Sequence, residues 1–105
     1  MEVAYSVEGY VFVWDSEKAD LNLEKHGISF EQACDVFFDV FYRMYPDTCE
    51  YEERWNIIGR SHCAHTIHPL CVVAVEKGEE AWRIVSARLA SRSERRRYEE
   101  DDDTD

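Results

Sequence analysis

The stretch at residues 14–33, "WDSEKADLNLEKHGISFEQA", contains the local signals that decide the fold. Asp15 or Ser16 can cap the first turn of a helix, because a short polar side chain there accepts a hydrogen bond from a free backbone N–H. The helix is expected to run through Lys25 and to stop at Gly27, since glycine readily adopts the left-handed conformation that ends helices. These signals predict a first helix directly after a short strand.

A second helix is predicted to begin at Ser29. Ser29 and Gln32 have the spacing of a capping box, in which each side chain satisfies a backbone N–H of the other residue. Apolar residues then recur at i, i+3, i+4 and i+7, which places them on one helical face. The residues predicted to face the core are Phe30, Ala33, Cys34 and Phe37.

Strand-like segments lie on both sides of this helix pair. Before it, residues 11–14 form an apolar run, which Tyr5 and Val7 can extend as the first arm of a hairpin through Glu8-Gly9. After it, strands are expected at 40–45, 54–59, 70–76 and 81–87, and Ser91 or Ser93 can cap a last short helix. The order predicts an α+β fold: an antiparallel sheet of four to five strands packed with two N-terminal helices and a short C-terminal helix.

Length and composition fit one small domain. A chain of 105 residues with 45% apolar residues can bury its own core. The longest apolar run, residues 70–75, is far shorter than the roughly 20 residues that cross a bilayer, and the start "MEVAYSVEGY" lacks the basic residues of a secretion signal. We therefore expect a cytoplasmic protein with no membrane partner, whose four cysteines are thiols.

The net charge of −11 is distributed unevenly. Residues 99–105, "EEDDDTD", contain six acids and no base, which leaves 17 acidic and 12 basic residues before them. Between Arg83 and Arg97, six arginines stand against one glutamate. The sequence therefore predicts an acidic body, one arginine-rich segment and a disordered acidic tail.

The stretch at residues 62–71, "HCAHTIHPLC", has two interpretations. Its three histidines and two cysteines could form a structural zinc site. Such sites commonly use two close ligand pairs on separate elements, however, and here Pro69 stiffens the chain just before a strand. We therefore favour a solvated hairpin loop over a zinc site built from Cys63, His65, His68 and Cys71.

Two other segments are better candidates for function. In the first helix, Lys18, Asn22 and Lys25 recur at i, i+4 and i+7 and so share one face. His26 stands at the helix C-terminus, where the helix dipole favours a charged imidazole. The alternative is a solvated helix face, with His26 only capping the last carbonyls.

The second candidate is "WRIVSARLASRSERRRYEE", residues 82–100. In a regular strand Arg83 and Arg88 point to opposite faces, unless the strand ends or bulges near Ala87. Arginine grips phosphate through two parallel hydrogen bonds, which favours an anionic ligand. The alternative is a set of surface salt bridges to the many carboxylates.

Together these segments resemble the BrnT family of bacterial toxins. The similarity spans residues 12–99, and "KHGISFEQA" and "RIVSAR" are its most specific motifs. The matching residues are Trp14, Asp15, Lys18, Asn22, Lys25, His26, Gly27, Phe30, Ala33, Phe37, Asp39, Glu53, Arg54, Gly59, Arg60, Arg83, Ile84, Ser86, Ala87, Arg88, Ala90, Glu94, Arg95, Tyr98 and Glu99.

The resemblance implies a RelE-like toxin domain over residues 1–98, followed by the tail at 99–105. It implies an endoribonuclease of a type II toxin–antitoxin system, which cleaves RNA and arrests growth; on the chemistry of that cleavage we expect no cofactor. It also implies a cognate antitoxin with a ribbon-helix-helix DNA-binding domain, through which alone the toxin reaches operator DNA. The acidic tail could compete with RNA for the neighbouring arginines.

RNA cleavage by a 2′-hydroxyl needs a base, an acid and cations for the developing charge, so arginine and lysine can replace a metal ion. We assign phosphate stabilisation to Arg54, Arg83 and Arg88, with help from Lys25. His26 or Glu53 is the candidate for proton transfer. The residues expected to hold the RNA backbone are Lys18, Arg60, Arg92, Arg95, Arg96 and Arg97.

Two alternatives compete with this hypothesis. One is a catalytically weak protein of the same fold that binds and regulates through an antitoxin-like partner. The other is a metal-binding module that uses the loop at residues 62–71. A DNA-binding protein in its own right is disfavoured, because no helix presents a basic stripe preceded by a recognition-type turn.

Overall fold

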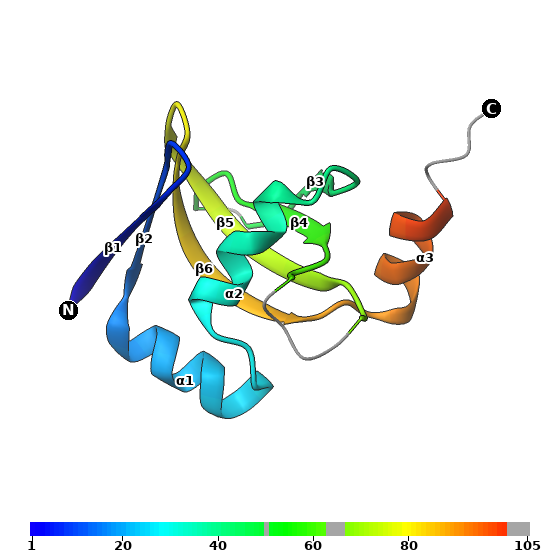
Figure 1. The fold of residues 1–105 in the computed structure, drawn as a ribbon, viewed down its shortest axis with the longest axis horizontal. Coiled ribbons are helices and arrows are strands. Elements are labelled where there is room, and N and C mark those ends of the chain that lie inside the picture. The colour runs from blue at the N-terminus through cyan, green and yellow to red at the C-terminus, as the bar shows by residue number, and fades with distance from the viewer. Residues whose placement is uncertain (50, 63–66, 101–105) are drawn as a thin grey trace.

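The computed structural model describes residues 1–49, 51–62 and 67–100. In this part of the chain a single sheet carries two helices on one face and has a third helix at its end (Figure 1). The elements are β1 (Glu2–Val7), β2 (Tyr10–Asp15), α1 (Ser16–His26), α2 (Phe30–Asp35), the 3-10 helix η1 (Val36–Phe38), β3 (Arg43–Pro46), β4 (Trp55–Gly59), β5 (Leu70–Gly78), β6 (Ala81–Leu89) and α3 (Arg92–Glu100).

The sheet confirms the predicted α+β class but corrects its details. Its strand order is β1-β2-β6-β5-β4-β3, so it has six strands and not four to five. β2 pairs with β6 in parallel, and the other neighbours are antiparallel. α1 and α2 cross over the sheet between β2 and the later strands, which allows the parallel pair. The two helices also follow a hairpin and are not N-terminal, so the RelE-like description fits only in part.

The helix signals are confirmed. The Asp15 carboxylate accepts from the Lys18 N–H (3.1 Å), and Gly27 ends α1 with a left-handed φ of 73°. Ser29 and Gln32 form the capping box that opens α2. In the described ranges, no helix is both long and apolar enough to span a membrane.

The third strand is shorter than predicted. β3 begins at Arg43, whereas a strand was expected from residue 40. The carboxylate of Asp39 accepts a hydrogen bond from the Phe41 N–H (2.9 Å), and the Asp39 carbonyl accepts one from the Tyr42 N–H (3.1 Å). These bonds fold residues 39–42 into a turn, which apolar patterning alone does not reveal.

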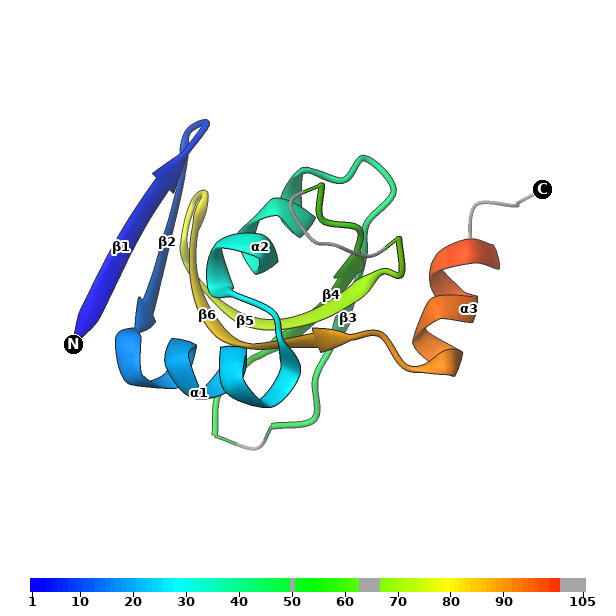
Figure 2. The same cartoon turned by 60° about the horizontal axis from the view of Figure 1, so that its bottom comes forward.

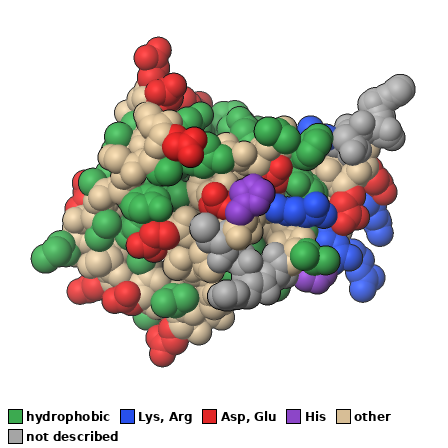
Figure 3. All heavy atoms as spheres, in the orientation of Figure 1, with side chains coloured by type: hydrophobic (Ala, Val, Ile, Leu, Met, Phe, Trp, Pro, Cys, Tyr) green, Lys and Arg blue, Asp and Glu red, His purple; other side chains and the backbone are tan. Residues whose placement is uncertain are grey.

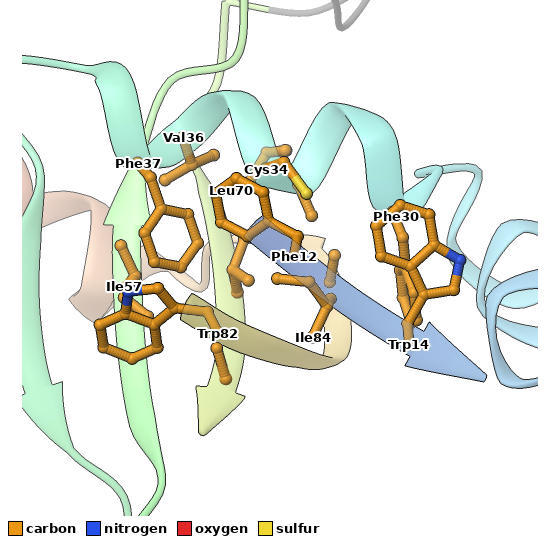
Figure 4. Packing of buried hydrophobic residues seen from close by; sticks show 14 of the residues in the cluster. Phe12, Trp14, Phe30, Cys34, Val36, Phe37, Ile57, Leu70, Trp82 and Ile84 are labelled. Atoms are coloured by element: carbon orange, nitrogen blue, oxygen red, sulfur yellow. The ribbon is translucent and has the colours of Figure 1, made fainter. Parts of the chain in front are cut away.

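The core lies between the sheet and the helices α1 and α2, which cover the same face in both views (Figures 1 and 2). Phe37 packs between Phe12 and Trp82, with ring centroids 5.0 Å and 5.2 Å apart (Figure 4). Cys34 is buried in this cluster, as predicted, and burial raises the pKa of its thiol. The thiol is therefore neutral and serves packing.

Asn22 forms hydrogen bonds with the backbone at the unpaired edge of β6. β2 pairs only with residues 81–83 of β6, so the backbone beyond them lacks a strand partner on that side. The Asn22 side chain donates to the Ala87 and Ile28 carbonyls (2.8 and 2.9 Å) and accepts from the Ala87 N–H (3.1 Å). The helical spacing groups Asn22 with the exposed Lys18 and Lys25, but Asn22 is buried and structural.

Candidate functional site

A β-bulge brings Arg83 and Arg88 to the same face of the sheet. Val73 of β5 pairs with Ser86, but its neighbour Ala74 pairs with Ile84, so Val85 is an extra residue in β6. An extra residue reverses the alternation of the side chains that follow it. The arginines therefore share the face opposite α1 and α2, while the core residues Trp82, Ile84 and Ala87 share the other.

Arg54 joins them on this face. The Arg54 carbonyl accepts from the Asp47 N–H (2.8 Å), which continues the β3–β4 ladder by one step beyond Trp55. By alternation Arg54 then points to the same side as Asn56, away from the helices. We call this side the open face and define it by Arg54, Asn56, Cys71, Val73, Val75, Arg83, Ser86 and Arg88.

Arg88 is held in place by α3. Its Nη1 and Nη2 donate to the two carboxylate oxygens of Glu94 (2.8 and 2.9 Å). Glu94 also caps α3 by accepting from the Ser91 N–H (2.8 Å), while the Ser91 hydroxyl accepts from the Glu94 N–H (3.2 Å). The paired guanidinium lowers the pKa of Glu94 to about 2, and the same hydrogen bonds raise the pKa of Arg88. The Arg88 guanidinium is thus fixed in orientation at the junction of β6 and α3.

Replacing Glu94 by glutamine should lower the free energy of unfolding at pH 7 by about 1–2 kcal/mol, because the variant loses a charge-assisted pair that is partly exposed to solvent. The folded pKa of about 2 lies below the reference value of 4.5, so the stabilisation is present above pH 4.5 and is lost as the pH falls toward 2. The stability difference between wild type and variant should shrink over that window. Urea unfolding at both ends of the window measures it, with Glu99→Gln as the control; a difference that does not change with pH would contradict the assignment.

Arg83 and Arg54 are held more loosely. Arg83 Nη2 pairs with Glu2 (2.9 Å), and Arg54 Nε pairs with Glu52 (3.1 Å). The Glu2 and Glu52 side chains are 61% and 41% exposed, against 20% for Glu94. The surface salt bridges of the alternative interpretation therefore exist, but exposed pairs contribute little free energy and a phosphate can replace the carboxylate.

A partly buried polar chain lies beside Arg88 on the open face. The Cys71 thiol approaches Asn56 Oδ1 (Sγ–O 3.7 Å), and Asn56 Nδ2 donates to Asp47 (3.1 Å). Burial, with the nearby Glu94 carboxylate, raises the pKa of Cys71 to about 12. A neutral thiol is a poor nucleophile, so Cys71 does not fit a covalent mechanism.

The predicted RNA-binding arginines gather at the α3 end of the molecule. Figure 3 shows the Lys and Arg side chains of that face near α3, whereas Asp and Glu are spread across it. The Arg97 guanidinium stacks 3.6 Å from the Tyr45 ring centroid, and Arg60 lies 5.5 Å from that of Tyr98. Arg95 contacts His68 Nδ1 (2.6 Å) and Glu99 (3.7 Å). Arg92 and Arg96 are exposed on α3.

The candidates for proton transfer lie on different sides of the sheet. Lys25 and His26 are exposed at the C-terminal end of α1, which packs against β6. Glu53 is exposed in the loop between β3 and β4, where Arg54 and its neighbours line a pocket of about 430 Å³. Their roles remain predictions.

Asp39 is an organising residue whose role sequence analysis did not identify. Its carboxylate accepts from the Tyr98 hydroxyl (2.6 Å) and from the N–H groups of Arg60 (2.8 Å) and Phe41 (2.9 Å). Burial opposes ionisation, but these hydrogen bonds lower the pKa of Asp39, while burial and the Asp39 carboxylate raise the pKa of Tyr98 to about 12. The signals in the sequence are an acid directly after the apolar run "VFF" and the match of Asp39 to the family pattern, and neither indicates these partners. The Tyr98 hydroxyl thus links α3 to the turn that follows η1.

The loop at residues 62–71 lies partly outside the described residues, which exclude Cys63 and His65. Among the described side chains, no three of His, Cys, Asp and Glu lie close enough to hold a metal ion. His68 contacts Arg95, and the His62 N–H donates to the Asp35 carboxylate. The metal-binding interpretation of this loop stays a hypothesis.

Known proteins are similar to this chain in sequence and in fold. The family model described as "Ribonuclease toxin, BrnT, of type II toxin-antitoxin system" matches residues 14–94. The crystal structure of the Brucella abortus ribonuclease toxin BrnT is similar with a TM-score of 0.57 and 27% sequence identity. That similarity covers 75% of this chain and 94% of the Brucella chain. A search of curated proteins finds no match.

Proposed function

The chain belongs to the BrnT family of ribonuclease toxins of type II toxin–antitoxin systems, and we propose that it cleaves RNA on its open face without a metal ion. Family membership supports the toxin over the catalytically weak alternative. The observation that carries the proposal is the bulge at Val85, because it brings Arg83 and Arg88 to the same side of the sheet, opposite α1 and α2, where Arg54 also lies. Arg83 and Arg88 are five residues apart, or about 15 Å along an extended strand, so they can contact different phosphates.

In the proposed reaction a ribose 2′-oxygen attacks the adjacent phosphorus while a base removes its proton. The bond from phosphorus to the 5′-oxygen breaks, and an acid protonates that oxygen, which leaves a 2′,3′-cyclic phosphate and a 5′-hydroxyl. Arg88 is assigned to the phosphoryl oxygens: Glu94 orients the guanidinium, and its Nε–H and second Nη2 N–H are the groups proposed to donate to the developing charge. Arg54 and Arg83 bind flanking phosphates, and Lys25 assists from the end of α1.

Proton transfer is assigned to His26 or Glu53. Glu53 lies in the loop just before Arg54, whereas His26 lies at the end of α1, which covers the opposite face of the sheet, so a single substitution at each separates them. A histidine would give a pH–rate profile with a limb near neutrality, whereas a carboxylate would give one at lower pH. The backbone-binding residues of this proposal are Lys18, Arg60, Arg92, Arg95, Arg96 and Arg97.

A toxin of a type II system has a cognate antitoxin as its partner. We propose that this antitoxin carries a ribbon-helix-helix domain and that operator DNA is bound only through it. The proposed location is the cytoplasm, where RNA and such a partner meet. The domain is proposed to end at residue 98; α3 itself continues to Glu100.

Purified protein should cleave single-stranded RNA in excess EDTA, because arginine and lysine provide all the charge that the mechanism needs. The products should carry 2′,3′-cyclic phosphate and 5′-hydroxyl ends, and a matched strand with 2′-O-methyl ribose should resist cleavage. Electrophoresis with end-group analysis measures both. Loss of activity in EDTA with recovery on adding Mg²⁺ or Zn²⁺, or cleavage of the 2′-O-methyl strand, would contradict the proposal.

A further inference from the structure

The turn between η1 and β3 exposes three apolar side chains in a row. Val40 is 86% exposed, Phe41 58% and Tyr42 38%. A run of exposed apolar residues on a small protein commonly marks a binding surface. Neither the predicted site nor the proposed mechanism uses these residues.

This turn is built rigidly. The Asp39 carboxylate and carbonyl hold the Phe41 and Tyr42 N–H groups. Gly59 of β4 lies directly beneath the turn. A Cβ atom at residue 59 would be 2.9 Å from Val36 Cγ1 and 3.3 Å from Tyr42 Cβ. Only glycine therefore allows the turn to approach β4 this closely. The backbone at Phe41 is therefore held in place, which lowers the entropic cost of ordering this turn on binding.

Phe41 borders a hollow of about 240 Å³ together with Arg60, Tyr98 and Glu99. The Arg60 guanidinium stacks on the Tyr98 ring at 5.5 Å, and the Glu99 side chain is 52% exposed on the rim. The volume lies below that of pockets for drug-sized ligands, so it fits a smaller planar group. An aromatic ring, a guanidinium plane and a hydrogen-bond acceptor together suit an unpaired nucleobase.

The hollow lies close to Arg88. Ile58, Cys71 and Arg88 are paired across β4, β5 and β6, and Arg60 follows Ile58 by two residues. Strand spacing and rise place Arg60 about 12 Å from Arg88 in the backbone. An RNA strand bound at Arg88 therefore has to extend by more than one nucleotide to place a base in the hollow.

We propose that Phe41, Arg60, Tyr98 and Glu99 form a base pocket, in which an unpaired base of the RNA substrate stacks on Phe41. The inference rests on the proposed ribonuclease function and adds a subsite to it. RNA fits this surface better than an apolar protein segment does, because Arg60 borders the pocket and the arginines of α3 lie beside it. Base–aromatic stacking is worth about 1–3 kcal/mol per base, which predicts a change of roughly five- to 100-fold in Kd.

The test measures binding of fluorescent decamers with 2′-O-methyl ribose, which cannot be cleaved by 2′-hydroxyl attack. Wild type should bind an adenine decamer at least about fivefold more tightly than an abasic decamer. Phe41→Leu keeps the apolar surface but removes the aromatic face, so it should abolish this preference, whereas Phe41→Trp should retain it. Leu21→Ala, which alters a residue 64% exposed on α1, is the control and should bind like wild type.

Retention of the base preference in Phe41→Leu would overturn the base pocket. If that variant also bound the antitoxin more weakly, the patch would belong to the protein partner instead. RNA cleavage by wild type is measured in the same preparations. Absence of both cleavage and decamer binding in wild type would contradict the proposed function itself, whereas cleavage without a base preference would contradict the base pocket alone.

Discussion

Replacing Arg88 by alanine should reduce the rate of RNA cleavage by at least about 100-fold, because removing one preorganised donor to a developing oxyanion typically has that effect. Arg88 is the only one of the three open-face arginines whose fork is bound through both terminal nitrogens to one carboxylate and directed by it. Single-turnover cleavage, measured with enzyme in excess over RNA, isolates the chemical step from binding.

Two variants make this prediction specific. Arg88→Lys keeps the charge but cannot form a bidentate contact, so it should recover only part of the rate. Arg96→Ala removes an exposed α3 charge and should weaken RNA binding, with a smaller salt dependence, while the single-turnover rate at saturation stays near wild type. Circular dichroism at the assay temperature checks the fold, because Arg88→Ala leaves Glu94 without its partner. A folded Arg88→Ala protein with near wild-type activity would contradict the assignment.

Replacing Asn22 by alanine should lower the free energy of unfolding by about 3 kcal/mol. The substitution removes the partners of the Ala87 N–H and of the Ala87 and Ile28 carbonyls, and each buried group left without a partner costs about 1 kcal/mol or more. The total stability of a domain of this size is about 5–15 kcal/mol, so a large fraction would be lost. Urea unfolding followed by the fluorescence of the buried Trp14 and Trp82 measures the change.

Asp20→Ala is the matched control, since Asp20 is exposed on the same helix and its removal should change stability by less than about 0.5 kcal/mol. Asn22→Asp keeps the acceptor but sets a buried carboxylate against the Ile28 and Ala87 carbonyl oxygens, so it should be at least as destabilising as alanine. Equal stabilities of Asn22→Ala and Asp20→Ala would show that the backbone groups of Ala87 do not depend on Asn22 for their hydrogen bonds.

Local signals in the sequence were sufficient to predict the helices. Asp15, Gly27 and the Ser29–Gln32 capping box act within one turn of the chain, so their consequences do not depend on the rest of the fold. The hairpin β1–β2 was foreseen only as a possible extension. Its parallel pairing with β6 depends on the crossover of α1 and α2, which no local pattern encodes.

The candidate site could be predicted in residue type but not in geometry. A strict alternation places Arg83 and Arg88 on opposite faces, and only the extra residue Val85, seen in the pairing with β5, reverses this. Asn22 illustrates the opposite error: its helical spacing groups it with Lys18 and Lys25, yet two of its three hydrogen bonds are with Ala87, 65 residues away. Such long-range contacts decide the role of a polar residue and are invisible in a single sequence.

The most direct test of the open face as the RNA site is amide chemical-shift mapping with an uncleavable 2′-O-methyl decamer added to isotope-labelled protein. We expect the largest shifts along β6 from Arg83 to Leu89, in the first turn of α3, and at Arg54 and Arg60. Shifts confined to α1 and α2, with β6 and α3 unchanged, would contradict this location and with it the assignment of Arg88.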